Sequence, residues 1–281
     1  MACIAGGPDK VKDNHEWWRA SYRARVVRTR TGGIEITATR IKHQLEASMN
    51  RRAKGEGVSR SDSVAVATRR ARRMIRWLIG ENRLDHLLTL TYRANVQDLG
   101  RVKTDWKRFV RFVRVRYPDW GFVAVPELQE RGAWHLHVAV QGRQDLNWLR
   151  KCWYRALGSK VWVTGSDTPG QINVRSPWKR WGGKGSKWDA AKLAGYLGKY
   201  IAKSFEDNAA LNARRYWPAK EMRSPEITRF YLDAVDTVGM IEEVAIIVRR
   251  LNGVGWSMFL SPDSNAFWIC ASGAPPETCP F

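Results

Sequence analysis

Short apolar runs rich in β-branched residues alternate with stretches of helical periodicity through the middle of the chain. Residues 86–92 (HLLTLTY) have the length and composition of a buried strand. Apolar residues then recur at helical spacing, which predicts a helix from about residue 99 to residue 116, and Pro118 ends it. The pattern therefore predicts a buried strand followed by an amphipathic helix.

Two more strand-like runs, 121–129 and 134–140, flank Glu-Arg-Gly-Ala, which is typical of a β-hairpin in which Gly132 takes the left-handed conformation. The remaining elements of this region are expected as helices at 145–157 and 188–205 and as strands at 161–163 and 172–174. This order predicts an α+β fold, with an antiparallel sheet and helices on one of its faces, of the ferredoxin-like or RNA-recognition type.

Both ends of the chain carry patterns of their own. The expected elements are a hairpin around Gly32 and Gly33, a basic helix at 63–79, an apolar helix at 227–251, and a terminal hairpin formed by 256–260 and 266–270. The sequence therefore divides into a basic N-terminal arm at 1–60, a central domain at 61–206 and a C-terminal extension at 207–281.

The charge of the chain narrows the class of partner. The 281 residues are 44% hydrophobic, enough for a packed core, and 48 Lys and Arg against 27 Asp and Glu give a net charge of +21. Such a field favours a polyanion, with nucleic acid first. The sequence has no apolar run near the roughly 20 residues of a spanning helix and no signal peptide. We expect a cytoplasmic protein without a membrane partner.

Other composition signals bear on how DNA would be handled. The four cysteines are scattered without a CxxC pair, which indicates reduced thiols. No GxxxxGK[ST] phosphate loop occurs, so strand separation would need a separate helicase. A basic, Trp-containing segment at 176–188 and the cations between Arg69 and Arg73 are suited to phosphate contacts and base stacking. Solvated cations and core tryptophans would look the same, so none of them is assigned to a site.

His135 and His137 form the first candidate site. On a strand, residues two apart project from the same face, so the two imidazoles lie side by side with Leu136 behind them. With a three-residue loop at 131–133, Glu127 faces His137 and joins them, whereas a two-residue loop would turn it to the opposite face. The chemistry favours an odd-length loop. Two histidines and a carboxylate with open positions suit Mn²⁺ or Mg²⁺.

Tyr196 and Tyr200 form the second candidate site. A spacing of four residues puts both phenols on one face of a helix, and Lys199 and Lys203 each follow a tyrosine by three residues. A phenol with a pKa of about 10 needs cationic neighbours, or a metal on the phosphate, to attack a phosphodiester. Taken alone, each pattern is also typical of structural side chains, histidines on a strand or tyrosines against a core.

Together these motifs resemble the HUH endonucleases, in particular the rolling-circle replication initiators of single-stranded DNA phages and related plasmids. LLTLTY at 87–92 is similar to the first, strand-forming motif of that family. ELQERGAWHLH at 127–137 matches its acidic residue, Arg-Gly turn and histidine pair, and YLGKYIAK at 196–203 matches its tyrosine helix. The resemblance spans about residues 84–205, so the domain at 61–206 would be the endonuclease domain.

The resemblance implies a site-specific DNA nickase and strand transferase acting on single-stranded DNA at a replication origin, with a separate helicase and polymerase. Glu127, His135 and His137 would hold Mn²⁺ or Mg²⁺. Tyr196 and Tyr200 would attack the scissile phosphate, leaving a 5′-phosphotyrosine and a free 3′-hydroxyl, and Lys199 would bind phosphate. Relaxases of this superfamily usually place the tyrosine before a three-histidine cluster.

Two alternatives to an initiator remain. A single-tyrosine transposase of the same superfamily also places its tyrosine downstream of the histidines, but the YxxxY pair argues against it. The alternative from another class is a non-catalytic single-stranded nucleic-acid-binding protein on a ferredoxin-like sheet, with structural histidines.

Overall fold

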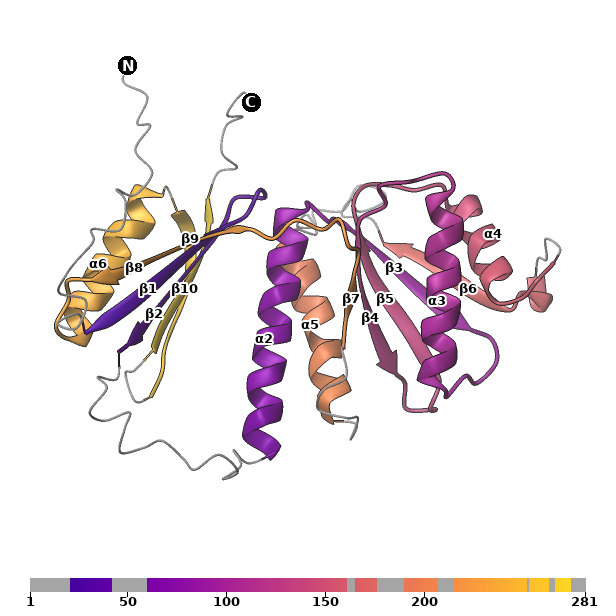
Figure 1. Cartoon of the computed structure of the whole chain (residues 1–281), viewed down its shortest axis with the longest axis horizontal. Helices are drawn as coiled ribbons and strands as arrows, with labels where there is room; N and C mark the ends of the chain where they lie inside the picture. Colours follow the sequence, from indigo (N-terminus) through magenta and orange to yellow (C-terminus); the bar gives the residue numbers. More distant parts are fainter. Residues whose placement is uncertain are drawn as a thin grey trace, which may run out of the picture. The chain divides into compact units, whose positions relative to one another are not determined.

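The computed structural model describes residues 21–41, 60–160, 165–175, 190–206, 215–251, 253–262 and 266–273. The fold is α+β with antiparallel sheets, as expected (Figure 1). Two compact units are present, one formed by residues 57–224 and the other by residues 1–56 together with 225–281. The expected strand at 161–163 and the basic Trp-containing segment at 176–188 lie outside the described residues. No helix in the described ranges is long and apolar enough to cross a membrane.

The unit at 57–224 is built on a five-stranded sheet of order β6-β3-β5-β4-β7. Its elements are α2 (Arg60–Glu81), β3 (His86–Tyr92), α3 (Leu99–Arg114), β4 (Phe122–Leu128), β5 (Trp134–Val140), α4 (Leu146–Ala156), a 3-10 turn η2 (Gly165–Asp167), β6 (Gly170–Arg175), α5 (Ala190–Glu206) and β7 (Trp217–Pro218). From β3 to β6 the order is strand, helix, strand, strand, helix, strand, the expected ferredoxin-like arrangement.

Helices cover both faces of this sheet, so the expectation of helices on one face was wrong. Residues such as Leu88, Leu136 and Val138 point to α3 and α4, whereas Leu87 and Ala139 point to α2 and α5 (Figure 1). The reason lies in the strands: residues 122–126 and 136–140 are buried without interruption, because successive side chains face opposite apolar layers.

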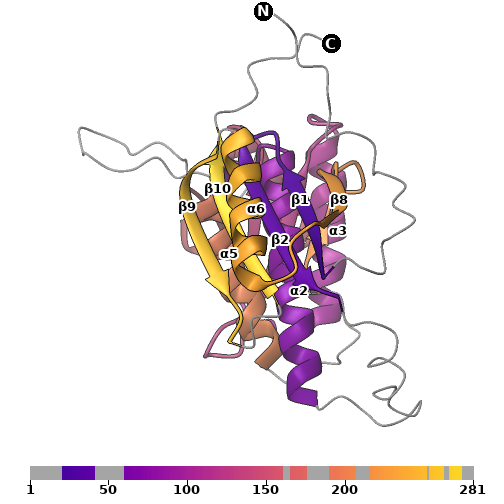
Figure 2. The same ribbon diagram turned by 90° about the vertical axis from the view of Figure 1, so that its left-hand side faces the viewer.

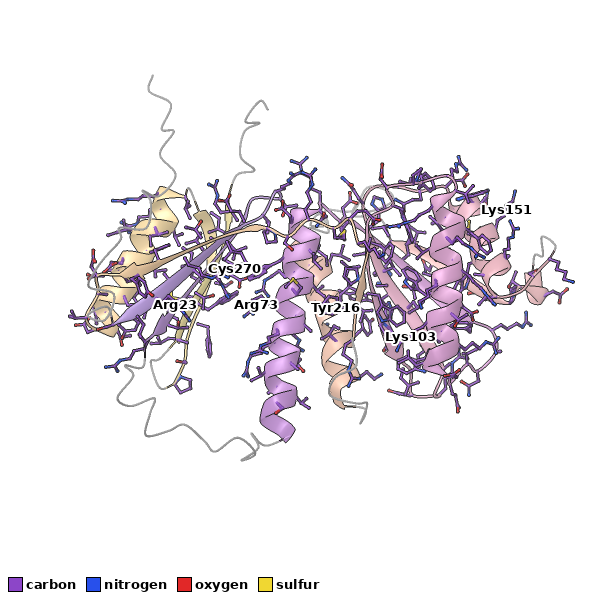
Figure 3. The ribbon with its side chains drawn as sticks, viewed as in Figure 1. Arg23, Arg73, Lys103, Lys151, Tyr216 and Cys270 are labelled. Atoms are coloured by element: carbon purple, nitrogen blue, oxygen red, sulfur yellow. The ribbon has the colours of Figure 1, made fainter. Side chains whose placement is uncertain are left out.

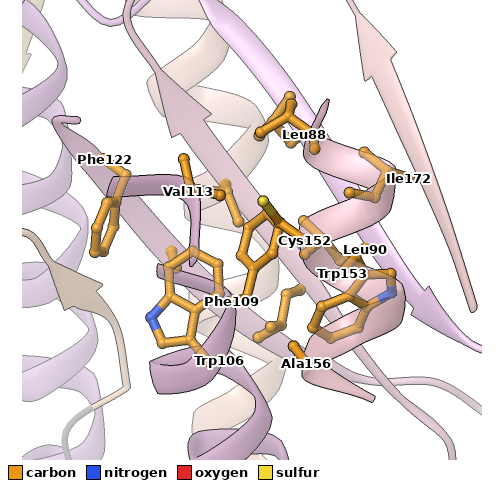
Figure 4. Packing of buried hydrophobic residues seen from close by; sticks show 14 of the residues in the cluster. Leu88, Leu90, Trp106, Phe109, Val113, Phe122, Cys152, Trp153, Ala156 and Ile172 are labelled. Atoms are coloured by element: carbon orange, nitrogen blue, oxygen red, sulfur yellow. The ribbon is translucent and has the colours of Figure 1, made fainter. Parts of the chain in front are cut away.

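The core under α3 and α4 is aromatic. Asp98 caps α3 by accepting hydrogen bonds from the amides of Gly100 and Arg101. The buried stripe of α3 then meets α4 and the sheet, where Phe109 lies edge-on to Trp153 at 5.6 Å between ring centroids (Figure 4). Trp106, Trp120 and Trp153 are each at most 5% exposed, so these three tryptophans are core residues and do not meet unpaired bases.

The other unit joins the two ends of the chain in one sheet of order β8-β1-β2-β10-β9. Its elements are β1 (Tyr22–Arg28), β2 (Gly33–Arg40), β8 (Glu226–Leu232), α6 (Thr237–Arg250), β9 (Gly253–Leu260) and β10 (Ala266–Gly273). Helix α6 lies on a face of this sheet, where Met240, Val244 and Val248 are fully buried (Figure 2). The expected hairpins at both ends are confirmed.

One expected element of this unit was wrong. The apolar helix at 227–251 is instead a strand, β8, followed by the shorter helix α6. Asp236 separates them, because its side chain accepts a hydrogen bond from the amide of Gly239 and so caps the helix. The sequence division gave each end its own extension, whereas in the structure β1 pairs with β8 in register from Tyr22–Leu232 to Arg28–Glu226.

Candidate functional site

The β4–β5 hairpin sets which side chains share a face. The amide of Gln129 donates to the carbonyl of Ala133 at 2.9 Å, so the loop is Glu130 to Gly132, with Gly132 at φ 80°. Glu127 then lies opposite His135. The expected pairing of Glu127 with His137 was wrong by two residues. The odd-length loop is confirmed, and a shift by two keeps Glu127 on the face of the histidines.

Glu127 links the hairpin to helix α5. Its Oε2 lies 2.8 Å from Nε2 of His137, and its Oε1 lies 3.5 Å from Nζ of Lys203. Burial alone would raise the pKa of Glu127, but the hydrogen bond and charge of His137 and the charge of Lys203 outweigh it and hold that pKa below its usual value. Glu127 is therefore an ionised carboxylate at neutral pH.

Thr89, on the neighbouring strand β3, completes the polar contacts of His137. Thr89 lies opposite His137 in the sheet, with Oγ1 3.4 Å from Nδ1. A carboxylate only accepts, so Nε2 carries the hydrogen shared with Glu127, and a neutral ring offers Nδ1 as acceptor to the hydroxyl. Sequence reasoning missed Thr89 as a site residue. The polar position inside the run LLTLTY, on the face of the histidines, was the available signal.

Both tyrosines of α5 lie against the histidine pair. The ring of Tyr200 stacks on that of His137, with 3.9 Å between centroids and 8° between planes. Tyr196 meets His137 edge-on at 5.9 Å and Tyr200 at 5.0 Å. The i, i+4 spacing puts both rings on one face of the helix, as predicted. The two motifs, about 60 residues apart in sequence, therefore meet in one place.

Packing of α5 on the sheet and on α2 holds this arrangement. Leu193, Leu197 and Ile201 are fully buried in the core that α5 shares with α2 and the strands. From α2, Nε of Arg72 donates to the carbonyl of Gly198 at 3.0 Å, and the guanidinium of Arg73 lies 5.3 Å from the centroid of Trp77. Two arginines of the basic helix thus have structural contacts.

The environment of Tyr200 keeps its phenol protonated at neutral pH. Burial raises the pKa of Tyr200 well above its ordinary value, and the hydrogen bond and charge of Tyr196 and the charge of Glu127 act in the same direction. The charge of Arg175 opposes them. Arg175 is exposed at the end of β6 and was also missed from the sequence, where nothing distinguished it from other cations.

Lys199 stands apart from these contacts. It is exposed on α5 and makes no hydrogen bond or ion pair within the described part of the chain, whereas Lys203 bonds Glu127. Of the two lysines, Lys203 is the one that the structure brings to the carboxylate. An exposed ammonium such as that of Lys199 remains accessible to a phosphate.

His135 carries an unpaired nitrogen. Its Nε2 is buried and has no hydrogen-bond partner among the described residues, and burial, followed by the charge of His137, lowers the pKa of His135. A neutral imidazole with a free nitrogen, a second imidazole and a carboxylate are suitable donors for a divalent metal. In the described ranges, however, no three His, Cys, Asp or Glu side chains converge to hold an ion, and Glu127 bonds His137 directly.

The family comparison covers this region. A family model for replication-associated proteins of the ORF2 type matches residues 85–205, which include nearly all of β3, the hairpin and nearly all of α5. Neither the curated proteins nor the solved structures gave a significant match. The similarity supports a role in DNA replication, as the sequence motifs implied, and it leaves both ends of the chain uncovered.

Proposed function

We propose that the protein initiates rolling-circle replication by nicking single-stranded DNA and transferring the strand through a 5′-phosphotyrosine. The observation that carries the proposal is the stacking of Tyr200 on His137 with Tyr196 at the edge of both rings. Groups suited to activating a phosphate and to attacking it thus lie within one site. The similarity to replication-associated proteins over residues 85–205 supports the same conclusion.

The proposed reaction forms one bond and breaks one. The phenolic oxygen of Tyr196 or Tyr200 attacks the scissile phosphorus and forms the phosphotyrosine ester. The bond from phosphorus to the 3′-oxygen breaks, and that oxygen takes up a proton to become the free 3′-hydroxyl. Because burial raises the pKa of Tyr200, its phenol enters the reaction protonated and loses its proton as the new bond forms. The charge of Arg175 favours the phenolate.

Glu127, His135 and His137 are the residues that would hold Mn²⁺ or Mg²⁺. The free, buried Nε2 of His135 and the donor types fit such an ion, and binding would require Glu127 to give up its direct bond to His137. A bound divalent ion would withdraw charge from a phosphate oxygen. Lys199, exposed on the same helix as the tyrosines, would contact a neighbouring phosphate.

Two tyrosines in one site allow two successive transfers. One phenol would cleave the origin, and the other would cleave the completed unit while the first remains esterified. The free 3′-hydroxyl then attacks the first ester and closes the circle, regenerating the phenol. The 5.0 Å between the rings of Tyr196 and Tyr200 places both within reach of the same phosphate region.

The decisive measurement is the covalent adduct. The wild-type protein, mixed with a single-stranded oligonucleotide of the origin and Mn²⁺, should give a protein–DNA band on a denaturing gel, with mass spectrometry locating the linkage. Each single variant, Tyr196→Phe or Tyr200→Phe, should retain part of the yield, and the double variant should retain none because no phenol remains. Tyr231→Phe, at an exposed tyrosine of β8, is the matched control. An adduct in the double variant would falsify the assignment of these nucleophiles.

A second candidate is a non-catalytic single-stranded nucleic-acid-binding protein. The direct bond between Glu127 and His137 favours it, since a histidine paired with a carboxylate is also a common structural contact. This candidate predicts binding of the same oligonucleotide that is independent of metal and strongly dependent on salt, with no cleavage under any condition.

A further inference from the structure

A basic pocket of about 560 Å³ lies between α3 and α4. These helices cover the face of the sheet opposite to that of the candidate site, since Leu88 and Leu136 point toward them whereas His135 and His137 point to the other side. The pocket is therefore separated from the histidines and tyrosines by the sheet itself. We propose that it is a second nucleic-acid-binding site, which holds backbone phosphates of DNA away from the scissile bond.

The side chains of the pocket are strongly cationic. None of its lining residues carries a carboxylate, and the cations come from α3, from α4 and from the segment after α4. They are Arg108, Arg111, Lys151, Arg155 and Lys160. All five are exposed, so their charges face solvent and a ligand. Such a cluster in a concave site attracts phosphate, and guanidinium groups bind phosphate oxygens in pairs.

Phe112 organises two of these guanidinium groups. The guanidinium carbon of Arg155 lies 4.7 Å from the centroid of the Phe112 ring, and that of Arg111 lies 5.1 Å from it. Stacking on a ring restrains an arginine and leaves its N–H groups free for an anion. The same contacts engage the ring, and Tyr154 is only 6% exposed, so the pocket offers charge rather than open aromatic faces. It is suited to phosphates and not to bases.

The carboxylate nearest to these cations lies outside the lining. Oδ1 of Asp105 is 3.8 Å from Nη1 of Arg108, and Asp105 itself is buried in α3. Part of the charge of Arg108 is thereby compensated. Arg111 and Arg155, which stack on Phe112, are the better residues for a test.

The identity of the polyanion as DNA rests on the proposed function, whereas the phosphate chemistry of the pocket does not. A net charge of +21 favours nucleic acid over an acidic protein. A short oligonucleotide bound at the tyrosines cannot pass around the sheet to the opposite face. Only longer DNA would occupy both places, so length separates the two sites experimentally.

The test compares two double variants of the full chain that remove the same charge. Arg111→Gln with Arg155→Gln alters the pocket, and Lys103→Gln with Lys107→Gln removes exposed cations of α3 outside it (Figure 3 labels Lys103 and Lys151). Fluorescence anisotropy measures the Kd for a long single strand, a duplex of equal length and a short oligonucleotide over a range of salt. Circular dichroism checks that each variant is folded, and Arg111→Lys with Arg155→Lys retains the charge if the Gln pair is unfolded.

The pocket variant should bind long DNA at least about tenfold more weakly than wild type, with a salt slope lower by about 1.4 on single strands or about 1.8 on duplex. The Lys103 and Lys107 variant should change much less. The arm with the larger loss identifies the strandedness of the ligand. The Lys-for-Arg variant should recover most of the slope while losing the paired hydrogen bonds of the guanidinium.

Equal losses in the two Gln variants would overturn the proposal, because they would reflect the general field of the chain. So would unchanged DNA affinity in the pocket variant, including the case in which only binding to polyglutamate is lost, which would make the occupant an acidic protein. Adduct formation on the short oligonucleotide should be the same in the pocket variant and the wild type. If the wild type forms no adduct, the proposed function fails, but the comparison of affinities still decides the pocket.

Discussion

Glu127 joins three structural elements through its two carboxylate oxygens. It lies on β4, bonds His137 of β5 at 2.8 Å, and pairs with Lys203 of α5 at 3.5 Å. A single carboxylate that is 13% exposed thus orients one imidazole and anchors the tyrosine helix near it. Groups that must act together are held by packing and by such bonds rather than by chain proximity.

Asp105 is a buried carboxylate on the other side of the sheet. Arg101 and Arg108 approach it at 3.7 Å and 3.8 Å, but burial outweighs both and raises the pKa of Asp105. The folded state therefore holds this proton more tightly than the unfolded state. The stability that results is complete below the unfolded pKa of about 3.9 and is lost as pH rises through the higher folded value.

Asp105→Asn should remove this pH dependence. In urea denaturation followed by tryptophan fluorescence, the free energy of unfolding should fall less between about pH 4 and about pH 7 in the variant than in the wild type. Asp119→Asn, which changes an exposed carboxylate, should leave the wild-type difference intact. A pH difference that is the same in Asp105→Asn and wild type would show that the buried carboxylate does not carry it.

At the scale of elements, periodicity predicted the central region well and register poorly. The run HLLTLTY is β3 to the residue, and helix α3 begins where its apolar spacing begins. The hairpin paired two residues away from the expected register, because the turn closes when Ala133 accepts from Gln129. Parity nevertheless follows from the chemistry of the site, since one face had to collect Glu127 with both histidines.

The second helical layer was legible but was not inferred. Strand β5 reads apolar at Leu136, Val138, Ala139 and Val140 without alternation, which is the pattern of a strand covered on both faces. The two polar residues in this pattern are the histidines. A continuous run interrupted only by His135 and His137 therefore indicates a doubly covered strand with a functional interruption.

Gly170 shows how closely β6 approaches its neighbours. A Cβ at this position would lie 2.2 Å from the carbonyl oxygen of Thr91 and 2.8 Å from Nε1 of Trp153. That oxygen also accepts the hydrogen bond of the Trp153 indole at 3.1 Å. Neither backbone nor a core tryptophan can yield cheaply, so only glycine fits where β6 meets Tyr92 at the end of β3.

Gly170→Ala should destabilise the protein by about 1–3 kcal/mol, since it over-packs the contact between β6, β3 and Trp153. Thermal or urea unfolding measures this loss. Gly142→Ala is a useful comparison because a Cβ there meets nothing within 4 Å, although its φ of 64° carries a smaller backbone penalty of about 1 kcal/mol. Equal stability of Gly170→Ala and wild type would contradict the close approach.

At the scale of the whole molecule, the pairing of the two ends was beyond the reach of sequence patterns. Tyr22 on β1 lies opposite Leu232 on β8, and Phe267 on β10 lies opposite Ala38 on β2. Alternation of apolar residues identifies a strand and its inner face but does not select a partner about 200 residues away. Each end therefore read as a separate extension, although both supply strands to one sheet.

The hydrophobic cores divide as the sheets do. The clusters around Trp106 and around Ile75 are formed wholly within residues 57–224, and the cluster around Met240 belongs wholly to the two ends of the chain. The central unit thus contains a complete core on each face of its sheet. It is also long enough to bury most of the surface that its unfolded chain would expose.

A fragment of residues 57–224 should therefore fold by itself, unfold cooperatively and form the adduct on the short oligonucleotide as the full chain does. A fragment that begins at Leu84 lacks α2 and exposes the face on which Leu193 and Leu197 pack, so it should aggregate or lose cooperativity. Circular dichroism melting and the adduct assay measure both fragments. Non-cooperative melting of the longer one would mean that the strands from the chain ends are required for its stability, and the separation of the cores would then not be one of folding units.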